Sequence, residues 1–259
     1  MTESASLSAK FRLDGRVAIV TGASKGIGAA IAHAFAEAGA SVVVSSRRQD
    51  AVDMVASEIV AKGGTAIGVA AHAGEPIDLE RLVEATMEQF GRIDVVVNNA
   101  ATNPAFGPLL EATDDLFDKV MNVNLRGPLT LSRIAHPYLA ASGRGSIVNI
   151  ASVEGLKPSE GLALYSVSKA ALISLTGAMA REWGGAGIRV NAICPGLIQT
   201  KFSATLWKND TIRQSFLAHV PSGRMGQPDE IAALALFLAS DAGSYCTGGT
   251  YVADGGYLI

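Results

Sequence analysis

The stretch that decides the fold is Thr21-Gly22-Ala23-Ser24-Lys25-Gly26-Ile27-Gly28. It follows a short β-branched run at 17–21 and leads into an Ala-rich segment, which is the strand–turn–helix order of a dinucleotide-binding unit. Gly22 permits a tight turn, while Gly26 and Gly28 let the backbone approach a pyrophosphate. The start of the helix offers free N–H groups and its positive dipole end to that anion. Glycines also form ordinary turns, but in this context the stretch predicts a dinucleotide site.

Beyond this stretch, short apolar runs alternate with longer Ala- and Leu-rich segments along the chain. The runs are apolar at nearly every position, which is typical of strands buried on both faces of a parallel sheet. The alternation predicts an α/β fold, a Rossmann-type doubly wound sheet of seven parallel strands with helices on both faces. The expected strands are 17–21, 41–46, 65–71, 93–99, 146–152, 188–194 and 249–254, and the expected helices are 27–38, 51–62, 76–90, 114–140, 164–183 and 228–239.

Length and composition fit one large unit. The chain has 259 residues, 49% of them hydrophobic and 17% charged, with a mean hydropathy of +0.29. These values exclude a disordered or fibrous protein. No repeat, charge block or Pro/Ser-rich linker marks a second domain, so 1–259 is expected to be a single domain with an N-terminal tail at 1–12.

One segment, 196–227, interrupts the strand–helix alternation for about 30 residues. Loops of this length inside a compact domain are usually lids or binding segments. Its Phe202, Leu206, Trp207 and Phe216 would be unusual on a plain solvated loop. The segment is therefore predicted to be a substrate lid, with an irregular helical pair packed on the core as the alternative.

Charge and targeting signals exclude several classes of partner. The 21 Lys and Arg residues against 24 Asp and Glu residues give a net charge of −3, with no long basic run, so neither nucleic acid nor a membrane surface is an expected partner. No apolar stretch reaches the roughly 18 residues of a membrane span, and MTESASLSAK lacks the apolar core of a secretory signal. Cys194 and Cys246 lack metal-ligand spacing, so no metal site is expected. We expect a cytoplasmic protein.

The end of the second expected strand indicates the cofactor. An NAD site usually carries an acid there to hold the ribose 2′-hydroxyl, whereas NADP sites carry a basic group. This chain has Ser46 and Arg47 at that point and no acid until Asp50. With Lys25, they could hold a 2′-phosphate through charge-assisted hydrogen bonds, although a solvated charged pair before a helix would look the same. The sequence predicts NADP(H) rather than NAD(H).

Tyr165 and Lys169 lie four residues apart in a helical segment, which places both side chains on one face. A nearby ammonium favours the phenolate and is expected to lower the pKa of the tyrosine from near 10 towards the range of useful acid–base chemistry. Ser152 ends the preceding strand, at the sheet edge where doubly wound folds bind ligands. A Tyr and a Lys at this spacing occur by chance on many helices. The pair indicates a catalytic site here because Ser152 is expected at the same edge of the sheet.

Together with the glycine-rich stretch, Asn98-Asn99-Ala100-Ala101 and Pro195-Gly196, these residues resemble the short-chain dehydrogenase/reductase family. The resemblance is to its single-domain branch and covers the chain from about residue 13 onward. It implies that Tyr165 exchanges a proton with the substrate oxygen, that Lys169 lowers the pKa of the tyrosine and holds the nicotinamide ribose, and that Ser152 hydrogen-bonds the carbonyl. Asn124 matches the asparagine that anchors a relay water beside the lysine, and Gly127-Pro128 would free a backbone group nearby. The implied catalytic residues are Asn124, Ser152, Tyr165 and Lys169.

The resemblance also implies cofactor contacts along the strand ends. Asn99 would lie along the cofactor, Asn98 could equally be structural, and Thr200 matches the threonine that contacts the nicotinamide amide. Where the family often has an Asp for the adenine, this chain has His72, which either contacts the adenine or is a solvated loop residue. The predicted cofactor-binding residues are Gly22, Ser24, Lys25, Gly26, Ile27, Gly28, Ser46, Arg47, His72, Asn99, Ala100, Tyr165, Lys169, Pro195, Gly196, Ile198 and Thr200.

Residues that follow the strands near Ser152, or lie in the 196–227 segment, are candidates for the substrate wall. The set is mostly apolar with one acid, which suits a neutral, moderately hydrophobic ketone or secondary alcohol. The predicted substrate-lining residues are Asn103, Phe106, Glu154, Leu156, Phe202, Leu206 and Trp207.

The segment 164–183 is apolar nearly all round, which predicts burial on more than one side. A subunit interface would cover it, and similar family members are commonly tetramers, so a homo-oligomer is expected.

Three functions fit the sequence. The leading prediction is an NADP(H)-dependent carbonyl reductase or alcohol dehydrogenase that acts on a small molecule. The alternative is a 3-oxoacyl-thioester (acyl-carrier-protein) reductase, for which Lys157, Lys201 and Lys208 would be the basic residues near the mouth. The third is a non-catalytic nucleotide sensor. Such a protein would be expected to lack the tyrosine or the lysine, and this chain has both Tyr165 and Lys169.

Overall fold

A computed structural model of the chain describes residues 6–207 and 209–259, and leaves the side chains of Thr205, Leu206 and Ile212 undescribed. Seven strands form one sheet in the order β3-β2-β1-β4-β5-β6-β7, with every pairing parallel. The predicted doubly wound α/β fold is confirmed. The strands are β1 Val17–Thr21, β2 Ser41–Ser46, β3 Thr65–Ala70, β4 Val95–Asn98, β5 Ser146–Ile150, β6 Arg189–Pro195 and β7 Thr250–Ala253.

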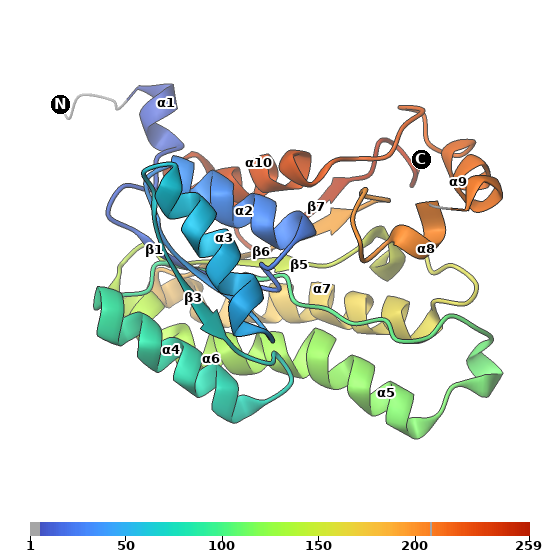
Figure 1. Cartoon of the computed structure of the whole chain (residues 1–259), viewed down its shortest axis with the longest axis horizontal. Helices are drawn as coiled ribbons and strands as arrows, with labels where there is room; N and C mark the ends of the chain where they lie inside the picture. The colour runs from blue at the N-terminus through green and yellow to red at the C-terminus, as the bar shows by residue number, and fades with distance from the viewer. Residues whose placement is uncertain (1–5, 208) are drawn as a thin grey trace.

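Helices cover both faces of the sheet (Figure 1). One face packs on α2, α3 and α10 through residues such as Ile31, Phe35 and Leu238, and the other on α4, α6 and α7 through Leu82, Leu139 and Met179. The strands supply both cores because side chains alternate along them. The helices are α1 Leu7–Lys10, α2 Gly26–Glu37, α3 Gln49–Ala61, α4 Pro76–Phe90, α5 Asp114–Met121, α6 Gly127–Ala141, α7 Ala163–Trp183, α8 Ala204–Trp207, α9 Asp210–Leu217 and α10 Pro228–Ala239.

Two expected elements differ from the prediction. The helix expected over 114–140 is three pieces, because a π-helical turn at Asn122–Arg126 separates α5 from α6. Pro128 explains the break, since it has no N–H to donate to the carbonyl four residues earlier. The strand β3 is only partly buried, because it lies at the edge of the sheet. Within the expected tail, Leu7–Lys10 forms a short helix capped by Ser6.

The 196–227 segment contains two short helices, α8 and α9. Two helices were expected from the alternative to a lid, an irregular helical pair. An isolated parallel bridge between Ile198 and Gly226 joins its two ends. Between those ends, Phe202 and Phe216 line the cleft described below. The segment is therefore helical and also borders the cleft.

The residues Ala163–Ala186, α7 and the turn after it, are long and apolar enough to cross a membrane by length and composition alone. The sequence argument, which required an unbroken apolar run, did not identify this segment. In the structure α7 is a core helix of the sheet, with Lys169, Leu172 and Thr176 buried against the strands.

Candidate active site

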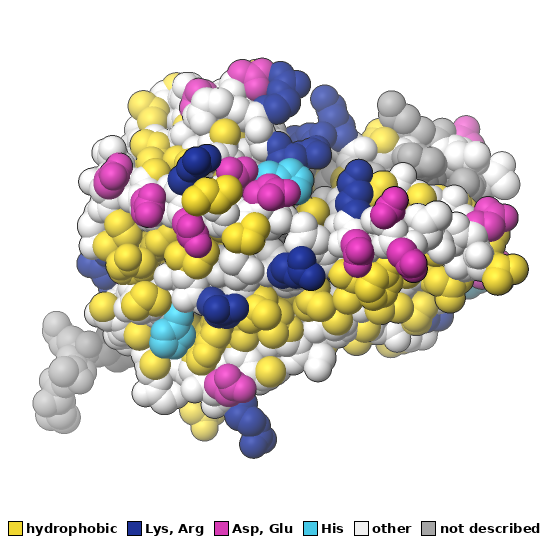
Figure 2. Space-filling view, turned by 90° about the horizontal axis from the view of Figure 1, so that it is seen from below, with side chains coloured by type: hydrophobic (Ala, Val, Ile, Leu, Met, Phe, Trp, Pro, Cys, Tyr) yellow, Lys and Arg dark blue, Asp and Glu magenta, His cyan; other side chains and the backbone are white. Residues whose placement is uncertain are grey.

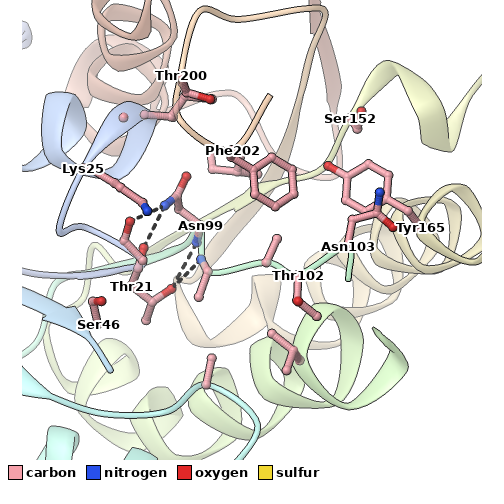
Figure 3. A pocket seen from close by; sticks show the side chains of 18 of the residues that line it. Thr21, Lys25, Ser46, Asn99, Thr102, Asn103, Ser152, Tyr165, Thr200 and Phe202 are labelled. Atoms are coloured by element: carbon pink, nitrogen blue, oxygen red, sulfur yellow. Dashed lines mark hydrogen bonds between the residues drawn. The ribbon is translucent and has the colours of Figure 1, made fainter. Parts of the chain in front are cut away.

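A cleft of about 1310 Å³ opens at the carboxyl ends of β1, β4, β5 and β6. The sheet order reverses between β1 and β4, and doubly wound sheets bind their ligands outside the strand ends at this point. The cleft runs from Arg47 at one end, past Asn99, to Tyr165 and Phe202 at the other. Figure 3 shows side chains from these separate segments converging on it.

The glycine-rich turn forms one wall of the cleft. Gly22 and Gly26 have φ angles of +64° and +59°, a region that side chains disfavour. Asn99 holds the turn in place by donating from Nδ2 to the carbonyls of Thr21 and Gly22, at 2.9 and 3.1 Å. Helix α2 begins at Gly26 with no side-chain cap. Its first N–H groups are therefore available to an anion in the cleft.

Gly28 has a different role from the predicted one. A Cβ at this position would lie 2.5 Å from Asn99 Nδ2 and from the Gly22 carbonyl oxygen. The residue is buried and is absent from the cleft wall. Gly28 thus permits close packing of α2 on the strands, and the approach to a ligand is left to Gly22 and Gly26.

The end of β2 carries the predicted recognition group for the cofactor ribose. Ser46 donates to Ser24 at 3.1 Å, which fixes the glycine-rich turn beside the end of β2. Arg48 is paired with Asp50. Arg47 lines the cleft and, among the described residues, has no ion-pair partner. Arg47 is therefore a guanidinium at the end of β2 that is free for a ligand phosphate.

His72 lines the cleft after β3, with its ring held by the local chain. Its Nδ1 accepts from the Gly74 N–H at 3.1 Å, and its own N–H donates to Asp78 at 3.0 Å. The ring therefore borders the cleft and is bonded within its own loop, and its contact with the adenine stays a prediction. The other predicted cofactor residues that line the cleft are Ser24, Lys25, Ile27, Ala100, Pro195, Gly196, Ile198 and Thr200.

Tyr165 and Ser152 meet at the other end of the cleft (Figure 3). The Ser152 hydroxyl lies beside the phenol, and its oxygen accepts from the Glu154 N–H at 3.1 Å. Burial raises the pKa of Tyr165 to about 12; the Ser152 hydrogen bond opposes the rise, and Glu154 and Cys194 add to it. The expected lowering of this pKa by Lys169 is wrong for this structure, because desolvation dominates.

Lys169 is buried one helical turn from Tyr165. Its Nζ donates to the Ile150 carbonyl at 2.7 Å and lies 5.6 Å from the centroid of the tyrosine ring. Burial lowers the pKa of Lys169 to about 8. The ammonium is therefore near both the tyrosine and the cleft, as the spacing predicted, but is positioned by the end of β5.

Asn124 lies in the π-helical turn, and its side chain does not reach the cleft. The amide donates to Thr102 O and Ser168 Oγ and accepts from the Thr102 N–H, at 2.7 to 3.0 Å. These bonds engage only the amide of Asn124, so the relay water that the resemblance implies at this residue stays a prediction. Its carbonyl loses the usual donor four residues ahead, because that residue is Pro128.

Comparisons with known proteins agree with this geometry. A family model described as enoyl-(acyl carrier protein) reductase matches residues 22–258. The Caenorhabditis elegans protein named dehydrogenase/reductase SDR family member 4 is 41% identical over 249 residues, which cover 95% of this chain and 96% of that protein. The chain belongs to the short-chain dehydrogenase/reductase family. It is therefore an oxidoreductase with a nicotinamide dinucleotide cofactor.

Two solved structures of this family are similar over nearly the whole length. One, from Beutenbergia cavernae, is described as a putative NAD(P)-dependent gluconate 5-dehydrogenase with bound NADP; it is 40% identical with a TM-score of 0.91, over 96% of this chain and 99% of that one. The other is a gluconate 5-dehydrogenase from Burkholderia cenocepacia in complex with NADP and tartrate. It is 32% identical with a TM-score of 0.92, over 96% and 98% of the two chains.

Only some of the residues predicted to line the substrate border the cleft. Asn103, Phe106 and Phe202 line the cleft, and the Phe202 ring lies 6.2 Å from the Tyr165 ring between their centroids. Leu156 is absent from the wall and 44% exposed. The side chain of Leu206 lies outside the described part of the chain.

Two further predicted wall residues support the local chain. Trp207 Nε1 donates to the Thr200 carbonyl at 2.8 Å, so the indole braces α8 against the turn and is absent from the wall. Glu154 borders the cleft, but its carboxylate oxygens accept from Ser159 and Ser166. Trp207 is therefore not part of the predicted wall, whereas Glu154 borders the cleft as predicted, with its carboxylate bonded to the local chain.

An aromatic cluster near the mouth was not among the predicted site residues. Phe216 of α9 lines the cleft and stacks on Tyr257, with ring centroids 4.6 Å apart and planes at 16°. Lys157 Nζ lies 5.1 Å from the Tyr257 ring centroid. The three residues come from distant segments, so no local sequence pattern identifies the cluster. Phe216 was the one visible signal, as an aromatic residue in an irregular segment.

Proposed function

We propose that the protein is an NADP(H)-dependent carbonyl reductase or alcohol dehydrogenase that transfers a hydride between the nicotinamide and a ketone or secondary alcohol. One observation carries this proposal. The Tyr165 hydroxyl lies beside Ser152 in a cleft that extends to Arg47, which has no ion-pair partner among the described residues. With a pKa of about 12, Tyr165 holds its proton at neutral pH and can donate it.

The residues of the nucleotide end fit the cofactor. Gly22 and Gly26 adopt the turn that brings backbone N–H groups to the cleft, and α2 starts there without a side-chain cap. These groups would hold the pyrophosphate, while Arg47, Ser46 and Lys25 would hold a 2′-phosphate. The absence of an acid at the end of β2 supports NADP(H) over NAD(H).

In the reductive direction, the bound cofactor supplies the hydride. Ser152 donates a hydrogen bond to the substrate carbonyl oxygen, and Tyr165 passes its proton to that oxygen as negative charge develops there. Lys169 keeps a positive charge near the tyrosine that has lost its proton. The carbonyl of Asn124, without its helical donor, would accept from a water that returns a proton towards Lys169.

The substrate end suits a neutral, moderately hydrophobic ketone. Phe106, Leu162, Phe202 and Phe216 supply apolar surface around Tyr165. Of the basic residues that an acyl-thioester reductase would use, Lys201 lines the cleft, Lys157 lies over Tyr257 and Lys208 falls outside the described residues. Lys157 and Lys201 are therefore available to a carrier-bound thioester, and the preference for a simple ketone rests on the apolar surface of the cleft.

We further propose a homo-oligomer, with a tetramer as the family default, in the cytoplasm. Apolar side chains gather in a broad band on the side of the molecule where α5 and α6 lie (Figure 2). Phe117 on α5 and Val167 on α7 are 42% and 51% exposed. Burial of such surface between subunits would be favourable.

The test is reduced-cofactor consumption by the purified protein, with NADPH and NADH in parallel. The panel contains aryl, cyclic and dicarbonyl ketones, the 5-keto form of gluconate and a 3-oxoacyl thioester. We expect turnover of simple ketones with NADPH. Turnover confined to the thioester or the sugar acid would contradict the proposed substrate class, and cofactor binding with no turnover would favour the nucleotide sensor.

A further inference from the structure

Glu154 is a buried acid beside the reacting groups, with 9% of its surface exposed. Its Oε2 accepts from the Ser159 N–H at 2.9 Å and from Ser166 Oγ at 3.0 Å, and its Oε1 accepts from Ser159 Oγ at 2.7 Å. All three contacts come from donors, which is the set that an ionised carboxylate accepts. The carboxylate is therefore fixed in place and unavailable to a substrate.

These contacts join three segments that form the reacting end of the cleft. The Glu154 N–H donates to Ser152 Oγ, so that this oxygen is held and its O–H remains free to donate. Through Ser159, the carboxylate holds the loop that follows β5. Through Ser166, it holds the first turn of α7, directly after Tyr165. Glu154 thus links Ser152, through its backbone N–H, to the start of α7 beside Tyr165, through its carboxylate.

The charge of Glu154 also acts on Tyr165. The groups that face the phenol are Ser152 and Glu154 after β5, Cys194 on β6, and Lys169 on its own helix. Glu154 and Cys194 raise the pKa of Tyr165 in addition to burial, whereas Ser152 lowers it. A negative charge beside a phenol disfavours the phenolate, so Glu154 helps the tyrosine keep its proton.

We propose that Glu154 is a positioning residue of this oxidoreductase: it braces Ser152 against α7 and places a fixed negative charge beside Tyr165. The inference rests on the proposed function, since it assigns Tyr165 as the proton donor. Its consequence is a tyrosine that stays protonated and ready to reduce a ketone. Oxidation of an alcohol then requires a higher pH.

The test compares pH profiles of alcohol oxidation for two variants. Glu154→Gln keeps the shape of the side chain and removes its charge, whereas Ser159→Ala keeps the charge and removes one hydroxyl of the brace. For Glu154→Gln, we expect the ascending limb of kcat/KM to move to lower pH by about half a pH unit, the effect of one partly screened charge. For Ser159→Ala, we expect a lower rate at every pH and no move of the limb to lower pH.

Each remaining outcome overturns a stated part. If the ascending limb of kcat/KM for Glu154→Gln coincided with that of the wild type, or moved to higher pH, the charge of Glu154 would not act on Tyr165. A Ser159→Ala variant with wild-type rates would show that there is no brace. Thermal unfolding of each variant confirms the fold, and Ser159→Ala keeps the brace testable if Glu154→Gln does not fold. Tyr165→Phe separates the two proposals, because its unchanged turnover would refute the proposed function itself.

Discussion

The two ends of the cleft are built in different ways. The nucleotide end consists of strand ends and a backbone turn, held by bonds such as those from Asn99 to the carbonyls of Thr21 and Gly22. The substrate end consists of irregular segments joined by side chains, such as Phe216 on Tyr257 and Trp207 on Thr200. A turn that needs glycine at fixed positions tolerates few substitutions, whereas a contact between two side chains can be replaced by another pair. Substrate choice can therefore change while the cofactor site stays constant.

The largest effect on the rate is expected at Tyr165, the proposed proton donor. Tyr165→Phe removes the proton donor and leaves the ring in place, so kcat should fall by about 1000-fold. Steady-state kinetics measure this, with the melting temperature as the control for folding. A variant that kept more than a tenth of the wild-type rate would show that the proton comes from elsewhere.

The next effect tests the nucleotide end alone. Arg47→Asp should weaken NADPH binding by about 100-fold, because it replaces a charge-assisted partner of the 2′-phosphate with a repulsive charge. NADH binding should change little. Arg48→Asp is the matched control, since Arg48 is already paired with Asp50. Equal losses for both nucleotides, measured by fluorescence titration, would contradict the assignment of Arg47.

A pair of glycines compares the stability of the two ends. Gly28→Ala should lower the free energy of unfolding by about 2 kcal/mol, because the new Cβ would lie 2.5 Å from Asn99 Nδ2. Gly107→Ala, in the loop at the substrate end, has no atom within 4 Å of its Cβ and should be close to neutral. Urea denaturation measures both. Similar losses at the two positions would remove the contrast between a fixed and an adaptable end.

The smallest effect concerns the substrate wall. Phe202→Ala should raise KM for an apolar ketone by about fivefold, through the loss of about 1 kcal/mol of apolar contact, with KM for NADPH unchanged. Leu156→Ala, outside the cleft, should change neither constant. A rise in both KM values for Phe202→Ala would show that the ring supports the cofactor end.

The sequence predicted well what local pattern specifies. The glycine-rich turn, the parallel seven-stranded sheet and the Ser152–Tyr165–Lys169 grouping follow from strand–turn–helix order and helical spacing, and the structure brings these residues together. The position of the nucleotide end needed no knowledge of distant contacts. It is fixed by where parallel strands end.

What the sequence missed depends on contacts between distant segments. Glu154 and Trp207 resemble wall residues in sequence, and only the structure shows that their polar atoms bond Ser159, Ser166 and Thr200. Asn124 bonds Ser168, the residue before Lys169, and only the structure shows that its amide is also used by Thr102. The pKa of Tyr165 was also missed, because desolvation depends on the whole surroundings of the phenol, whereas spacing reveals only the lysine.

The central claim is hydride transfer from the nucleotide end to a carbonyl beside Tyr165. The most direct measurement is reduction of a ketone with NADPH that carries deuterium at C4 of the nicotinamide, tested separately on each face, followed by mass and NMR analysis of the alcohol. Direct hydride transfer predicts that one of the two labelled forms of NADPH transfers a single deuterium to the carbinol carbon. An alcohol without deuterium from either form, or no alcohol from any ketone, would contradict it.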